Sequence, residues 1–189
     1  MPGKAGRGWR SAGTLIAAAA VALAGAAAVS QWLAAGRAED ALAGLESERT
    51  ARLEVSAAAH AFGQALLSYD YENLPAGRTR ITALATADFV GAYDEAFGGR
   101  MEQVIAKLKA RSQAGVRDVY VAAVERAEAR AVVVVDQQVT TAETITSVKD
   151  SHLKIALVKE KDTWKVREVT VLGAAQENRH PVGGARRPS

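Results

Sequence analysis

An uncharged run of residues from Ser11 to Gly36 places the strongest constraint on this chain. The basic residues Lys4, Arg7 and Arg10 precede the run, and Arg37 follows it. About 20 predominantly apolar residues in a helix cross a bilayer core, so the run is long enough to span a membrane. Because the leading segment carries only basic charges, the positive-inside rule places the N-terminus in the cytoplasm. We therefore expect a single-pass cell-membrane protein whose C-terminal domain is extracytoplasmic.

Two other interpretations of this run stay open. Its Ala-x-Ala sequences between Gly25 and Ala38 are typical of a cleaved signal peptide, and a soluble Ala-rich helix is the third interpretation. The run exceeds the roughly 7 to 15 apolar residues of a signal peptide, and Trp32 lies near its outer end, where indole rings favour the interface. These features favour a retained signal anchor. The anchor residues are Leu15, Ile16, Val21, Leu23, Val29, Trp32 and Leu33.

The composition excludes several classes of function. The chain contains no cysteine, which rules out disulfide bonds, thiol catalysis and thiolate metal sites. Its formal net charge is +3, and the three basic residues before the membrane run account for that value. The rest of the chain is electrically balanced. Nucleic-acid binding requires a clustered basic face, so the composition disfavours it.

Composition and periodicity divide the chain into five segments. We expect a cytoplasmic basic tail at 1–10, a transmembrane helix at 11–36, a helical stalk at 37–54, a folded domain at 55–173 and a disordered tail at 174–189. The stalk contains good helix formers with mixed charges, and it is either solvated or in weak contact with a partner helix. The final segment has almost nothing to bury.

Helical periodicity marks the first half of the domain. After a loop at residues 71–77, a second helix is expected from Arg78 to the Gly98-Gly99 pair, and a third begins near Met101 and is closed by Gly115. The first helix carries an apolar stripe at alternating steps of four and three, formed by Val55, Ala59, Phe62, Leu66 and Tyr69.

Extended periodicity marks the second half, with strands expected at 116–124, 131–140, 151–159 and 164–172. Four successive valines, Val132–Val135, indicate a strand buried on both faces at the centre of the sheet. A turn at 161–163 joins the last two strands as a hairpin. Three helices followed by four strands predict an α+β domain in which the helices pack on one face of an antiparallel sheet.

Several motifs occur in a fixed order along this domain. The Val-rich strand runs into Asp136-Gln137, residues 153–159 read LKIALVK, and Trp164 lies within DTWKV. Phe89 and Tyr93 lie four residues apart in the second helix. With the anchor and stalk, these motifs resemble the Mce-associated (mammalian cell entry) membrane proteins of actinobacteria over nearly the whole chain.

The resemblance implies an NTF2-like or cystatin-like domain with a curved sheet, and a noncatalytic accessory role in an Mce-type lipid import complex of the cell envelope. The lipid would be a sterol or a fatty acid, and the partners would be the bilayer and proteins of the transport complex. The alternative hypothesis is a module that binds a lipid or sterol and hands it to a transporter. A third hypothesis is an NTF2-like enzyme. The candidate pocket or contact residues are Phe62, Phe89, Tyr93, Phe97, Asp136, Gln137 and Trp164.

An enzymatic interpretation would draw on five residues: His60, Tyr69, Asp70, Asp88 and Tyr93. The two tyrosines lie on apolar stripes, where a phenol ring usually fills a core, and the carboxylates lie at a helix end or on a solvated face. The three histidines are far apart in the sequence and have no carboxylate cluster beside them. We therefore expect no catalytic residue, no metal site and no cofactor.

Overall fold

The computed structural model describes residues 40–173 and 176–182. The chain separates into two compact units, Met1–Glu48 and Arg49–Ser189. In the first unit, residues 40–48 are helical and exposed. The expected membrane segment, from Ser11 to Gly36, lies outside the described residues. Within the described ranges, no helix combines the length and apolar character needed to cross a bilayer.

The second unit begins with a helix at residues 49–67, here called the first helix. Val55, Ala59 and Phe62 have no exposed surface, as the expected apolar stripe requires. The stripe ends earlier than the sequence indicates. Tyr69 belongs to a two-residue strand, β1 (Tyr69–Asp70), which is separated from the helix by Ser68 alone.

The second expected helix is divided into α2 (Leu74–Leu84) and α3 (Ala87–Phe97). The break occurs at Thr86, whose backbone N–H donates to the Val166 carbonyl at 2.9 Å. The Thr86 side chain also accepts a hydrogen bond from Phe89 N and caps α3. Because the Thr86 N–H is bonded to a strand, it cannot form the hydrogen bond that would continue the helix. This long-range contact therefore ends α2.

The last helix is α4 (Arg100–Leu108). Gly99 precedes it with a φ of 63°, which glycine adopts without steric cost. Lys109 ends it in the left-handed conformation, so the helix stops well before Gly115. Gly115 instead lies inside a strand.

The described residues form a six-stranded antiparallel sheet in which four long strands follow each other as a meander. Lys161 and Asp162, both with positive φ, join the last two long strands, as in a type I′ hairpin. The α+β class with a curved antiparallel sheet is confirmed. The strands after β1 are β2 (Arg111–Val124), β3 (Glu128–Thr140), β4 (Thr144–Glu160), β5 (Thr163–Gly173) and β6 (Gln176–Pro181).

The expectation of a disordered tail is wrong for residues 176–181, which form β6. This strand pairs with Thr144–Lys149, the first part of β4, whereas β5 pairs with the second part. An unpaired strand edge presents backbone N–H and C=O groups, and any extended segment can satisfy them without apolar side chains. The polar composition of the tail therefore did not reveal this pairing.

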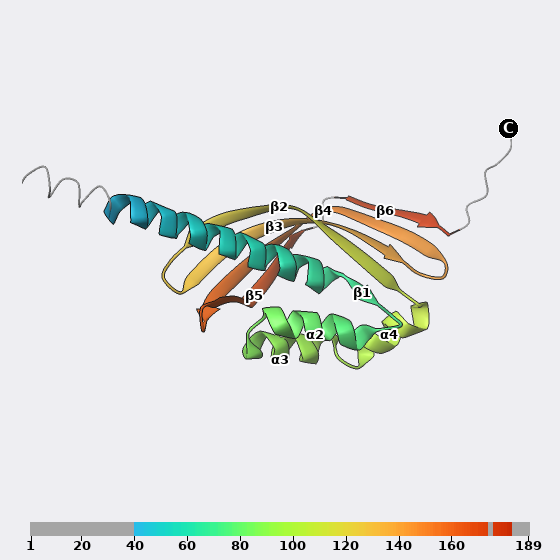
Figure 1. The fold of residues 1–189 in the computed structure, drawn as a ribbon. Helices are drawn as coiled ribbons and strands as arrows, with labels where there is room; N and C mark the ends of the chain where they lie inside the picture. The colour runs from blue at the N-terminus through green and yellow to red at the C-terminus, as the bar shows by residue number, and fades with distance from the viewer. Residues whose placement is uncertain (1–39, 174–175, 183–189) are drawn as a thin grey trace, which may run out of the picture. The chain divides into compact units, whose positions relative to one another are not determined.

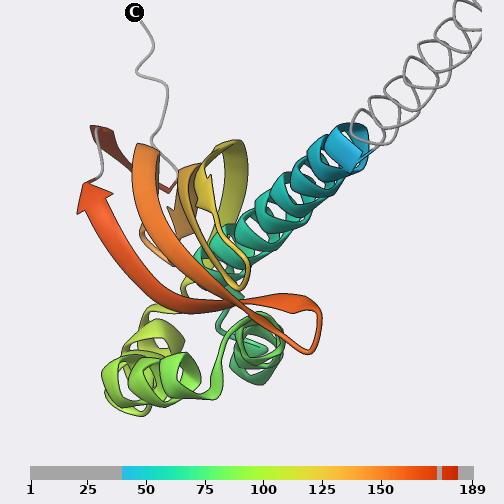
Figure 2. The same ribbon diagram turned by 90° about the vertical axis from the view of Figure 1, so that its left-hand side faces the viewer.

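Register shifts interrupt the ladders of β2, β3 and β4. At one of them Asp150 has a φ of 55°, and its N–H donates to the Asp136 side chain at 3.0 Å. Such bulges bend a strand and increase its twist. Figure 2 shows the resulting curved sheet, and Figure 1 shows α2, α3 and α4 gathered on one side of it.

The inner face of the sheet meets the first helix in a closely packed core. Val133 and Val135 are fully buried, while Val132 on the opposite face is partly exposed. A Cβ added to Gly63 of the first helix would lie 3.1 Å from Val133 Cγ1, so glycine permits the close approach. The fully buried sheet residues also include Ile155, Leu157 and Val166.

We expect Val133→Ala to lower the free energy of unfolding by about 2 kcal/mol, because it removes two buried methyl groups and leaves a cavity. Val132→Ala removes the same atoms from the partly exposed face and should cost less than about 1 kcal/mol. Urea unfolding of the purified chain, followed by circular dichroism, measures both. Equal costs would contradict the assignment of the inner face.

Candidate functional site

A cavity of about 470 Å³ lies between the inner face of the sheet and the helices of the second unit. Its volume is within the range of small-molecule sites, about 300 to 1,000 Å³. The end of the first helix supplies one wall, and α2, α3 and α4 supply most of the rest. Apolar lining residues include Leu66, Ile81, Met101, Ile105, Val169 and Val171.

A row of aromatic rings runs along α3 beside this cavity. Phe89, Tyr93 and Phe97 are spaced four residues apart, which places them on one helix face. Phe89 and Tyr93 stack with ring centroids 6.4 Å apart, and Tyr93 and Phe97 stack at 5.1 Å. Phe97 is 46% exposed and lies where the row meets solvent. These three rings line the cavity.

Phe62 lies beneath this row and does not line the cavity. It is fully buried and packs edge-on against Phe89, with centroids 5.3 Å apart and an interplanar angle of 79°. Offset and edge-to-face pairs are the arrangements that aromatic quadrupoles favour. The four expected aromatic residues therefore form one continuous cluster, with Phe62 as its anchor in the core.

Gln137 brings a polar group to the cavity wall from β3. Its Nε2 donates to the Leu67 carbonyl at 3.2 Å and to the Ser112 hydroxyl at 2.8 Å. Ser112 is 4% exposed, and its hydroxyl in turn donates to the same carbonyl. Because a carbonyl only accepts, the amide nitrogen must face Leu67. The amide oxygen of Gln137 remains available to accept from a ligand.

An ion pair between α2 and α3 forms another part of the lining. Arg78 Nε donates to Asp94 Oδ1 at 2.8 Å, and a second guanidinium nitrogen donates to Oδ2. This two-point contact fixes both side chains. The hydrogen bonds from Arg78 lower the pKa of the Asp94 carboxyl below its ordinary value of 3.8.

The Asp94 pKa provides a test of this pair. Arg78→Gln should raise the pKa of Asp94 toward 3.8, because the cation that favours the carboxylate is lost. Since the native pKa is depressed, the pair stabilises the fold above the unfolded-state pKa, and this contribution is lost as pH falls through the native value. Carbon-detected NMR titration of Asp94 measures the shift. An unchanged Asp94 pKa in Arg78→Gln would contradict the contact.

Burial raises the pKa of the Tyr69 phenol and, with the charges of Asp94 and Glu102, that of the Tyr93 phenol. Both phenols line the cavity, and both are neutral at physiological pH. They offer hydroxyl groups and not anionic bases. The cavity therefore combines apolar walls and uncharged hydrogen-bonding groups with three charged side chains, Arg78, Asp94 and Glu102.

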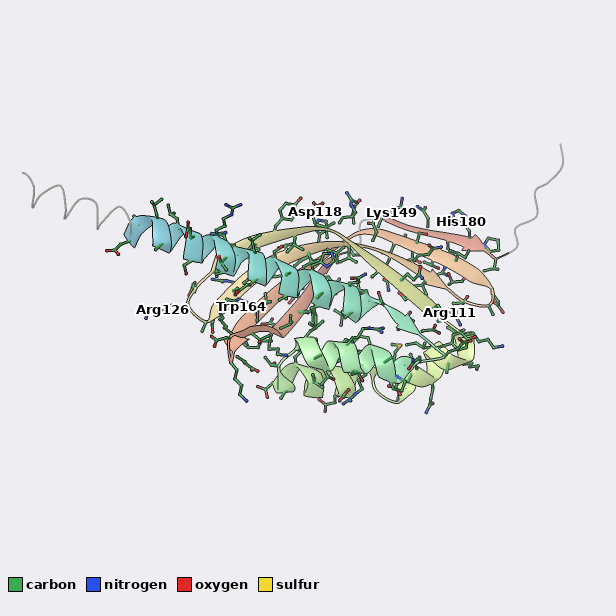
Figure 3. The ribbon with its side chains drawn as sticks, in the orientation of Figure 1. Arg111, Asp118, Arg126, Lys149, Trp164 and His180 are labelled. Carbon is green, nitrogen blue, oxygen red and sulfur yellow. The ribbon has the colours of Figure 1, made fainter. Side chains whose placement is uncertain are left out.

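Two further expected positions lie away from the cavity. Asp136 contacts Arg117 at 3.7 Å and accepts from the Asp150 backbone, so it supports the bulge between β3 and β4. Trp164 is 5% exposed, and its indole N–H donates to Glu54 of the first helix at 3.3 Å. Figure 3 shows Trp164 between this helix and the sheet.

The remaining candidates for catalysis do not converge. Asp70 forms an ion pair with Arg111 at 3.3 Å, while His60 and Asp88 are exposed on different helices. Among the described residues, no group of three or more His, Asp or Glu side chains is placed to hold a metal.

Sequence patterns did not associate Arg78 or Glu102 with the site, because each reads as an ordinary charge on a solvated helix. The lining residues Met101, Ile105 and Val169 read as core residues. The spacing of these apolar residues predicts that they face the interior of the domain. It does not show that they surround a cavity instead of packing against one another.

Several solved structures resemble this domain, among them a periplasmic domain and a VirB8 homologue. The periplasmic domain of DotI aligns with a TM-score of 0.54 at 15% sequence identity, covering 64% of this chain and 94% of that chain. CagV of Helicobacter pylori strain 26695, a VirB8 homologue of a T4SS, aligns with a TM-score of 0.50 at 16% identity, covering 66% and 99%. The likeness concerns the fold alone, which is an NTF2-like fold. Neither a protein-family model nor a curated protein sequence matches the chain.

Proposed function

We propose that this chain is a membrane-anchored, noncatalytic accessory protein of an Mce-type lipid import complex in the cell envelope. The uncharged run from Ser11 to Gly36 would anchor it, with the N-terminus in the cytoplasm and the NTF2-like domain outside. An anchored domain meets neighbouring membrane proteins at high effective concentration, so a weak interface suffices for association. The motif order that resembles Mce-associated proteins supports the choice of complex.

The similar solved structures support an extracytoplasmic accessory role. One is a periplasmic domain, and the other is a homologue of a T4SS component. The same fold thus occurs in proteins of bacterial envelope machinery. Fold alone does not determine function, so this support extends to the setting of the domain and not to its cargo.

The observation that carries the noncatalytic role is the chemistry of the cavity. Its two tyrosines have raised pKa values through burial, and its arginine is bound to a carboxylate. General bases and nucleophiles are instead activated by an adjacent base or by a pKa matched to the working pH. These features support a role in binding over a role in catalysis.

A test begins with the membrane fraction. The intact chain should stay there after alkaline carbonate washing, and its affinity purification from host membranes should recover Mce-type transporter subunits. His60→Ala and Asp70→Asn, checked for folding, should leave uptake of labelled lipid nearly unchanged because neither residue belongs to the cavity. A soluble chain shortened near Ala38, or loss of uptake in either folded variant, would overturn the proposal.

A second role, as a module that binds the lipid and passes it to the transporter, is favoured by the cavity itself. Its apolar lining and aromatic row would bury an acyl chain or a ring system. The exposed edge of Phe97 places the aromatic row in continuity with the surface, from which a ligand would enter.

Two tryptophan substitutions on β5 separate this role from a purely structural one. Val169 lines the cavity, whereas Thr170 is exposed on the opposite face, because successive strand residues alternate. Val169→Trp should fill the cavity and weaken lipid binding at least about tenfold, equal to 1.4 kcal/mol. Thr170→Trp should leave binding unchanged. Photocrosslinking of the intact chain with diazirine-labelled lipids measures both, and equal labelling would reject a cavity-bound lipid.

A further inference from the structure

The charges around the cavity decide which head group it accepts. Of the described residues that line it, Arg78 is the only cation, whereas Asp94 and Glu102 are both carboxylates. Arg78 already donates two hydrogen bonds to Asp94. Glu102 has no ion-pair partner among the described residues. An anionic head group would therefore meet a net negative wall.

The ion pair between Arg78 and Asp94 weakens the attraction of this cation for a fatty acid. Arg78 gives two of its five N–H donors to Asp94, so a fatty acid at the remaining donors would share a cation that Asp94 already neutralises. The incoming carboxylate would then lie in a cavity that Asp94 and Glu102 also line. Like charges repel, and each carboxylate raises the pKa of the others.

The uncharged groups of the lining suit a different head group. The Gln137 amide uses its nitrogen for both of its hydrogen bonds, which leaves the amide oxygen as an acceptor. Tyr69 and Tyr93 add hydroxyl groups that donate or accept. A hydroxyl head group both donates to the amide oxygen and accepts from a phenol. A carboxylate only accepts and would leave the Gln137 oxygen unpaired.

We propose that this cavity binds an uncharged lipid alcohol in preference to the corresponding fatty acid. The aromatic row of α3 and the apolar side chains of β5 would cover the hydrocarbon part, and Gln137 would accept from the hydroxyl. This inference rests on the lipid-binding role proposed above. It selects between the two lipid classes that the family resemblance leaves open.

The test uses two photoactivatable probes, diazirine analogues of 1-dodecanol and dodecanoate, which share one chain and differ in head group. The intact chain is placed in phosphatidylcholine nanodiscs at a pH where the fatty acid is ionised, and labelled peptides are identified by mass spectrometry. We expect the alcohol to label cavity-lining peptides at about tenfold lower concentration than the acid, equal to 1.4 kcal/mol. Equal or stronger labelling by the acid would overturn the inference.

Charge variants of the chain allow a second comparison that uses the acid probe alone. Asp94→Asn frees Arg78 and should strengthen labelling by the acid about fivefold, the value of an exposed ion pair near 1 kcal/mol. Glu102→Gln should act in the same direction without disturbing the link between α2 and α3. Asp88→Asn, an exposed change on α3 outside the cavity lining, should have no effect.

The outcomes separate this inference from the proposed function. If neither probe labels the cavity in the folded chain, the lipid-binding role fails, and the head-group preference fails with it. If both probes label it equally, and Asp94→Asn leaves the acid unchanged, the preference alone is wrong. Copurification with the transporter is independent of both results, so the accessory role is judged separately.

Discussion

The contact between Gly63 of the first helix and Val133 of β3 sets the spacing on which the domain depends. With no side chain at this point, the helix backbone lies close against the inner face of the sheet, and Val55, Ala59 and Phe62 are sealed on the same side. This part of the inner face is fully packed. Further along the same face, α2, α3 and α4 cover the sheet and line the cavity with it. One sheet thus has a closed half and an open half.

In the open half, the apolar and the polar parts of the cavity wall arise in different ways. The aromatic row comes from the period of a single helix, whereas the polar wall comes from contacts between distant segments. Gln137 reaches Leu67 across 70 positions in the sequence. The Arg78–Asp94 pair joins two helices that sequence periodicity reads as one. The apolar wall of the cavity therefore follows from local sequence periodicity, whereas the arrangement of its polar and charged groups depends on long-range contacts.

Sequence patterns predicted the features that depend on local periodicity. The alternation of Leu153, Ile155 and Leu157 gave the buried face of β4, and the turn at Lys161-Asp162 gave the hairpin that follows. The break at Thr86 was missed because it arises from a backbone hydrogen bond to β5, which no local pattern records. β6 was missed for the same reason, since strand pairing at an edge requires backbone groups and not apolar side chains. The aromatic cluster was expected, but its separation into a buried anchor and cavity-lining rings depends on tertiary packing.

The attachment of α3 has a mechanical consequence. Its first turn is tied to β5 by Thr86, which is both its cap and a donor to the Val166 carbonyl, while its last ring, Phe97, is partly exposed to solvent. Phe89, Tyr93 and Phe97 are all carried by this one rigid rod. Near the other end of this helix, Asp94 is held by Arg78 of α2, so α3 is joined to its neighbours at both ends. The place of the aromatic cavity wall is therefore set by the placement of the whole helix and not ring by ring.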